Sequence, residues 1–152
     1  MLKAKTIVLA LAVAVLLTGP AVAEPADEVS ALYQQFVAAQ NARDLDRVSA
    51  LFLPSPQFLW VSDGMSIWGR DAVVKRMSLF QQADVWHAEP NLSKAVAITI
   101  DGHAALLHLP LVLTIGSKDR PEKFGFLVTV LGVETVEGWR IAGLFTTTDK
   151  SN

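Results

Sequence analysis

Apolar residues recur at helical spacing in the first part of the chain, after residue 24. Pro25 suits a first helical turn, and it precedes an apolar stripe formed by Val29, Leu32, Tyr33, Phe36 and Val37. Asp44 can cap a second, shorter helix, and Gly69-Arg70-Asp71 can open a third. The pattern therefore predicts three amphipathic helices, each with one face laid on an apolar surface.

The remaining segments follow the patterns of strands and turns. Asp63-Gly64 is typical of a hairpin turn between short strands at Gln57 to Ser62 and Met65 to Trp68. The second half is rich in β-branched and large apolar residues, and it predicts four strands, near Val85 to Ile100 (bent at Pro90 or Ser93-Lys94), His103 to Ile115, Lys123 to Val136, and Trp139 to Thr148. Helices followed by a meander indicate an α+β fold with an antiparallel sheet. Strands of this length must coil, so we expect a cone-shaped, strongly curved sheet that packs on the N-terminal helices and encloses a pocket.

The first 23 residues have the pattern of a secretory signal peptide. Lys3 and Lys5 precede an apolar run from Ile7 to Leu17, and Ala21-Val22-Ala23 forms a cleavage site. The apolar run is too short for a membrane-spanning helix. We therefore expect cleavage after Ala23, a single mature domain over residues 24–152 with no membrane span, and a periplasmic or secreted location.

Charge and cysteine content argue against several classes of function. Without Lys3 and Lys5 the mature domain has 11 basic and 15 acidic residues, a net charge of −4. Scattered basic residues on an acidic domain argue against nucleic-acid binding, which needs a basic face. The chain has no cysteine, which excludes disulfides, a thiol nucleophile and thiolate metal ligands.

Three segments resemble motifs of the nuclear transport factor 2-like superfamily. They are Phe36-Val37-Ala38-Ala39-Gln40-Asn41-Ala42-Arg43-Asp44-Leu45, Trp68-Gly69-Arg70-Asp71-Ala72-Val73 and Glu137-Gly138-Trp139-Arg140-Ile141. Their order and spacing are similar to those of the SnoaL-like subgroup and span the mature chain. The resemblance implies the same conical fold, on which isomerases, cyclases, dehydratases, transport adaptors and ligand binders are all built.

The resemblance also implies a test for one activity. Ketosteroid isomerases share this fold and use an aspartate base with a tyrosine and aspartic acid pair. When the chain is registered on the shared motifs, these three places are held by Phe36, Trp60 and Leu131. None of these side chains can transfer a proton, so we expect no chemistry of that kind.

Under the same registration, strand alternation assigns the residues that face into the cone. On the two longest strands these are the even positions of 104–112 and the odd positions of 127–133. The resulting candidate ligand-binding residues are Phe36, Trp60, Ser62, Trp86, His108, Thr129, Leu131, Leu144 and Thr146. An apolar wall with a few polar groups is typical of a small-molecule site, although the same side chains could simply fill the cone as core.

His108 is the candidate for acid–base chemistry because it interrupts the apolar run from Ala104 to Val112. It could act as a general base or a hydrogen-bond anchor, or it could be a half-buried histidine bonded to a backbone carbonyl or to Thr129. His87 and Glu89 lie two residues apart and His103 sits at a turn, which is too little for a metal site. We therefore expect no metal and no cofactor.

The alternate positions of the two long strands are apolar as well. With the helices on one face of the sheet, a second subunit would cover the other, and the expected homodimer core includes Leu109, Leu111, Phe126 and Val128. If the alternation is reversed, these residues line the cone, and the other face of the sheet is still apolar and uncovered.

These observations favour an exported protein that binds a small hydrophobic or amphipathic molecule without a cofactor. One alternative is a cofactor-independent isomerase, cyclase or dehydratase that uses His108. Another is a dimeric structural or partner-binding module whose cone is filled by its own side chains.

Overall fold

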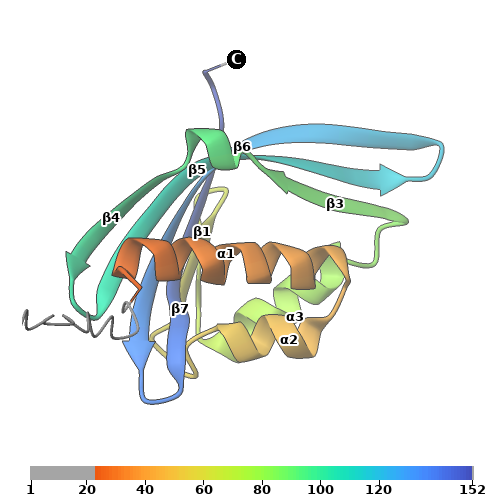
Figure 1. Ribbon diagram of the computed structural model, residues 1–152. Coiled ribbons are helices and arrows are strands. Elements are labelled where there is room, and N and C mark those ends of the chain that lie inside the picture. Colours follow the sequence, from red (N-terminus) through yellow and green to blue (C-terminus); the bar gives the residue numbers. More distant parts are fainter. Residues whose placement is uncertain (1–22, 152) are drawn as a thin grey trace, which may run out of the picture.

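The computed structural model describes residues 23–151, in which three helices pack on a seven-stranded sheet (Figure 1). The predicted signal peptide lies outside the described residues except for Ala23. None of the helices in residues 23–151 is long and apolar enough to cross a membrane. The α+β architecture predicted from the sequence is confirmed.

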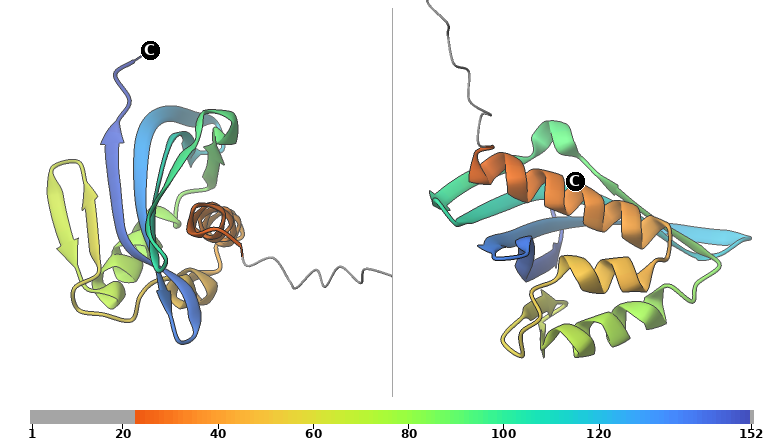
Figure 2. Two further views of the ribbon diagram at one scale, coloured as in Figure 1. Left: turned by 60° about the vertical axis from the view of Figure 1, so that its left-hand side comes forward. Right: turned by 60° about the horizontal axis from the view of Figure 1, so that its bottom comes forward.

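The three predicted helices form where the periodicity places them. They are α1 (Pro25–Asn41), α2 (Leu45–Leu51) and α3 (Arg70–Phe80). Asp44 caps α2, since its Oδ1 accepts a hydrogen bond from the Arg47 backbone N–H at 2.9 Å. Helix α1 lies across one face of the curved sheet (Figure 2), with α2 and α3 beneath it in the view of Figure 1.

The sheet has the order β2-β1-β7-β6-β5-β3, and β4 pairs with β5 beside β3. The strands are β1 (Leu59–Ser62), β2 (Met65–Trp68), β3 (Val85–Pro90), β4 (Val96–Asp101), β5 (Ala104–Ser117), β6 (Arg120–Thr135) and β7 (Gly138–Thr148). All pairs are antiparallel except β1 with β7. The sheet is therefore mostly antiparallel, with one parallel contact where the first hairpin joins the last strand.

The strand expected near residues 85–100 is two strands. Strands β3 and β4 are separated by the short 3₁₀ helix η1 (Leu92–Lys94), and each pairs with a different part of β5. At the junction the Asn91 backbone N–H donates to the Pro110 carbonyl oxygen at 2.9 Å. Pro110 has no N–H to donate in return, which suits the point where the neighbouring strand changes.

The alternation predicted for β5 and β6 is wrong. Leu107, Leu109, Val128 and Val130 are at most 2% exposed and belong to the core between the sheet and α1. The expected dimer core is therefore mistaken: Leu109 and Val128 are buried inside, and Leu111 and Phe126 face the same side. We call this the inner face of the sheet, and the opposite one the outer face.

A β-bulge between β6 and β7 explains the reversal. Without a bulge, the hairpin that pairs Thr135 with Gly138 would pair Leu131 with Ala142. In the structure Gly132 pairs with Ile141 and Leu131 with Gly143, so Ala142 is an extra residue. A regular hairpin would pair the inward-facing Leu144 with Thr129 and so place Thr129 and Leu131 on the inner face, whereas the bulge pairs Leu144 with Val130. The error passes to β5 through the pairing of His108 with Thr129.

The edge strand β3 is tied to α1 by one side chain. The Asn41 amide donates from Nδ2 to the Ala88 carbonyl oxygen at 2.9 Å, and its Oδ1 accepts from the Ala88 N–H at 2.8 Å. The edge of β3 that faces away from β5 is therefore satisfied at this point by a helix residue. This places Trp86 and Ala88 beside α1.

Candidate functional site

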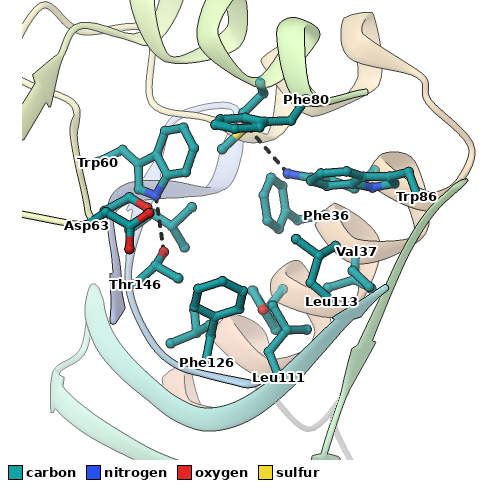
Figure 3. Close-up of a pocket in the computed structure, with 17 residues that line it drawn as sticks. Phe36, Val37, Trp60, Asp63, Phe80, Trp86, Leu111, Leu113, Phe126 and Thr146 are labelled. Carbon is teal, nitrogen blue, oxygen red and sulfur yellow. Dashed lines mark hydrogen bonds between the residues drawn. The ribbon is translucent and has the colours of Figure 1, made fainter. Parts of the chain in front are cut away.

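A cavity of about 140 Å³ lies between α1, α3 and the inner face of the sheet (Figure 3). Most of its wall is apolar or aromatic, and the residues that line it are Tyr33, Phe36, Val37, Gln40, Trp60, Ser62, Asp63, Met77, Phe80, Trp86, Ala88, Leu111, Leu113, Phe126, Val128, Leu144 and Thr146. Asp63 and Phe80 are exposed, whereas Tyr33, Phe36 and Val128 are at most 4% exposed. The cavity therefore opens to solvent beside Asp63 and Phe80 and ends against α1 and β6.

Six of the nine residues predicted for the site lie in this wall. They are Phe36, Trp60, Ser62, Trp86, Leu144 and Thr146. They come from α1, β1, β3 and β7, for which the helical stripe and the strand alternation were read correctly.

The other three, His108, Thr129 and Leu131, lie on the outer face, so none of them reaches the cavity. His108 is exposed, and its Nδ1 lies 2.9 Å from the Thr129 hydroxyl oxygen. The hydrogen bond to Thr129 that the alternative named is thus present, but the histidine is exposed and not half-buried. Of the three residues placed at the isomerase positions, Phe36 and Trp60 line the cavity and Leu131 does not. Phe36 and Trp60 therefore argue against isomerase chemistry, and Leu131 does not.

Tyr33 is a cavity residue that the sequence analysis did not single out. It belongs to the apolar stripe of α1, and this stripe was its only signal. Burial raises the pKa of its hydroxyl well above the usual range, because the phenolate would be poorly solvated. Tyr33 therefore remains a neutral phenol, which can donate or accept a hydrogen bond within the cavity.

Polar groups near the mouth come from the β1 strand and its turn. The Trp60 indole N–H donates to the Thr146 hydroxyl at 3.1 Å, which fixes the indole plane in the wall. Asp63 follows Ser62 and lies beside Trp60 in Figure 3. Asp63 has a φ of 49°, a left-handed conformation that Asp and Asn tolerate better than other non-glycine residues. Hairpin geometry therefore explains its place, and its carboxylate is the only negatively charged group in the wall.

Aromatic rings surround the end of the cavity at α3. Phe36, Trp60, Phe80 and Trp86 come from four different elements and face a common space in Figure 3. The rings of Trp60 and Phe80 meet edge to face, with 6.5 Å between their centroids. The Trp86 Nε1 atom is buried and has no hydrogen-bond partner among residues 23–151.

The residues weighed for metal binding lie apart from the cavity. His87 and Glu89 are exposed on β3, and His103 pairs instead with Glu134, its Nδ1 lying 2.7 Å from Oε2. That hydrogen bond and the charge of Glu134 raise the pKa of His103. Within residues 23–151, no group of three or more His, Cys, Asp or Glu residues is arranged to hold a metal ion.

Comparison with known proteins gives a consistent assignment of the fold. Residues 29–144 match the family described as the SnoaL-like domain. A structure with a cystatin-like fold from Caulobacter vibrioides is 26% identical, with a TM-score of 0.71, and the match covers 84% of this chain and 91% of that one. No curated protein sequence matches the chain.

Two further structures are similar at lower identity. A candidate dehydratase of the NTF2-like family from Streptomyces avermitilis is 17% identical, with a TM-score of 0.71 and coverage of 83% of this chain and 96% of that one. A candidate calcium/calmodulin-dependent protein kinase II association domain from Xanthomonas campestris is 16% identical, with a TM-score of 0.70 and coverage of 91% and 100%. At these identities the likeness concerns the fold alone.

Proposed function

Since the chain belongs to the SnoaL-like domain family, we propose that its cavity binds a small hydrophobic or amphipathic molecule, after export and cleavage following Ala23. The supporting observation is an apolar cavity with one open end and few polar groups, which is the usual make-up of a small-molecule site. Its size suits an aromatic ring or a short alkyl group, because an apolar cavity of about 150 Å³ can hold benzene. The rest of a larger ligand would extend past Asp63 and Phe80.

An enzymatic role is the second candidate, because one structure of this fold carries the name of a dehydratase. His108 cannot supply the base, since it lies on the outer face. The ionisable groups that line the cavity are Asp63, at an exposed turn, and the neutral Tyr33. This pair favours binding over proton transfer, because the buried Tyr33 stays neutral and no hydrogen bond joins it to Asp63 within residues 23–151.

The binding proposal predicts that filling the cavity abolishes binding of an apolar probe. Val128 is 2% exposed and lines the cavity, so Val128→Phe would place a ring in the free space. We expect the affinity for N-phenyl-1-naphthylamine, measured by fluorescence titration, to fall about tenfold or more. Circular dichroism would establish that the variant is folded.

The matched control is Val133→Phe, the same exchange on the same strand. Val133 pairs with Ala104 and Arg140 and lies on the outer face. The Val133→Phe variant should therefore bind the fluorescent probe with the same affinity as the wild type. Equal affinities for wild type and Val128→Phe would show that the probe binds elsewhere and would contradict the proposal.

We also propose that the outer face joins two copies of the chain. Cross-strand partners place Val96, His108, Thr129, Phe145 and Val61 in one row, and Ile98, Leu106, Leu131, Gly143 and Leu59 in the next. Neither row contains a charged residue, and both Val96 and Ile98 are 55% exposed. Two uncharged, mainly apolar rows are compatible with themselves in a twofold contact centred on them, which brings no like charges together.

This second proposal predicts that a charge on the outer face separates the copies. We expect a dimer at micromolar concentration for the wild type and a monomer for Ile98→Asp, because burying an unpaired charge costs several kcal/mol. Size-exclusion chromatography with light scattering measures both. Val136→Asp is the control, since Val136 is fully exposed in the β6–β7 turn, away from the two rows, and should remain dimeric. A monomeric wild type would overturn this proposal.

A further inference from the structure

The residues that line the cavity carry negative charge and no positive charge. Asp63 is the only residue with a formal charge at neutral pH among those that line it, and no lysine, arginine or histidine does so. Tyr33 stays neutral because its burial raises the pKa of the hydroxyl. A ligand that enters past Asp63 therefore meets a single negative charge at the mouth and no positive charge in the wall.

The aromatic rings of the cavity also favour a positively charged ligand. The face of an aromatic ring carries partial negative charge and attracts cations, most strongly in tryptophan. Trp60 and Trp86 line opposite sides of the cavity, together with Phe36 and Phe80 (Figure 3). The Arg76 guanidinium carbon lies 5.2 Å from the centroid of the Phe80 ring, so one of these rings already receives a cation. Arg76 does not line the cavity, which leaves the two indoles for a ligand.

The mainly aromatic wall also bears on which groups the ammonium nitrogen carries. The Thr146 hydroxyl already accepts from Trp60, and the remaining side-chain acceptors of the wall belong to Tyr33, Gln40, Ser62 and Asp63. A primary ammonium has three N–H donors to satisfy, whereas a quaternary ammonium has none. A cation with alkyl groups on nitrogen therefore fits an aromatic wall better than a primary amine does.

We infer that the ligand is an amphipathic organic cation with a tertiary or quaternary ammonium group. This inference rests on the proposed binding function. The ammonium group lies among Trp60, Trp86 and Phe36, with the Asp63 carboxylate at the mouth. The apolar part of the ligand lies against the side of the cavity formed by Leu111, Leu113 and Phe126.

Two probes of the same shape test this inference on the mature chain. Phenyltrimethylammonium and tert-butylbenzene differ in one atom, nitrogen or carbon, and therefore in charge. Each would compete with N-phenyl-1-naphthylamine in a fluorescence titration. We expect the cation to bind about fivefold more tightly than the neutral probe, in the range that cation–π contacts supply.

Asp63→Asn provides the second measurement. Asparagine tolerates the left-handed conformation of this turn, so the variant removes the charge and keeps the hairpin. We expect the affinity for phenyltrimethylammonium to fall about threefold, which is modest because Asp63 is exposed, and the affinity for tert-butylbenzene to stay the same. Asp119→Asn, the same exchange in the exposed turn between β5 and β6, should change neither.

The outcomes separate this inference from the function on which it rests. If tert-butylbenzene binds as tightly as the cation or more tightly, the inferred ligand class is wrong and the apolar binding site stands. If Asp63→Asn and Asp119→Asn affect the cation equally, the role assigned to Asp63 is wrong. If neither compound displaces the fluorescent probe, both the inference and the proposed binding function are overturned.

Discussion

Leu109→Asp is expected to leave the domain unfolded, whereas His108→Asp, one residue away, should leave it folded. Leu109 is 0% exposed in the core beneath α1. Removing a buried leucine costs about 2–5 kcal/mol, and leaving a carboxylate buried without a partner adds several more. The sum is comparable with the whole free energy of unfolding of a typical domain, about 5–15 kcal/mol.

The substitution His108→Asp should lower the free energy of unfolding far less. His108 is exposed on the outer face, and its hydrogen bond to the Thr129 hydroxyl is worth about 1 kcal/mol. Far-UV circular dichroism and urea unfolding of the two variants measure the difference. A folded Leu109→Asp beside an unfolded His108→Asp would mean that the inner and outer faces have been exchanged.

These two residues also show why the strand faces could not be predicted from the sequence. Leu106 and Pro110 flank His108 on the outer face, and Leu107 and Leu109 lie on the inner face, so both sets are apolar. Alternation identifies a buried face only when the other face is polar. The predicted faces of β6 then depended on a regular hairpin with β7, and the extra residue Ala142 shifts that pairing by one residue.

The helices and the first hairpin were predictable because their signals are local. Asp44 caps α2 through a bond to a residue three positions away, and Asp63 and Gly64 both have positive φ at the turn that they form. The cavity residues on these elements, such as Phe36 and Trp60, were identified correctly for the same reason. Phe126 and Val128 were missed because their placement depends on a bulge located in another hairpin.

Gly132→Ala is expected to destabilise the domain by about 1–3 kcal/mol, the usual cost of an overpacked core. A Cβ atom at Gly132 would lie 2.7 Å from Cγ2 and 3.1 Å from Cβ of Val29. Val29 is 0% exposed in the first turns of α1, and its short branched side chain has little freedom to move away. The helix would have to shift from β6, and urea unfolding monitored by circular dichroism measures the cost.

Two further variants show whether the contact with Val29 causes this loss. Gly102→Ala adds the same atom at an open position, with nothing within 4 Å, and should change the stability by much less. In the double variant Val29→Ala, Gly132→Ala, the new methyl group occupies space that the smaller helix residue vacates. Its cost should therefore be smaller than the sum of the two single costs. Strictly additive costs would mean that the contact is not responsible.

The division of one sheet edge into two short strands, β3 and β4, also affects how readily the protein could aggregate. An unpaired strand edge is a template for another chain, and the hazard grows with its length. The longest strands here, β5 with 14 residues and β6 with 16, are interior over most of their length, while the outermost strands β2, β3 and β4 have only 4, 6 and 6 residues. The 3₁₀ helix η1 interrupts one of the two sheet edges. On that edge the Asn41 side chain also bonds the Ala88 backbone of β3. The sheet therefore offers no long edge for runaway strand addition, which is compatible with the proposed contact of two copies through the outer face.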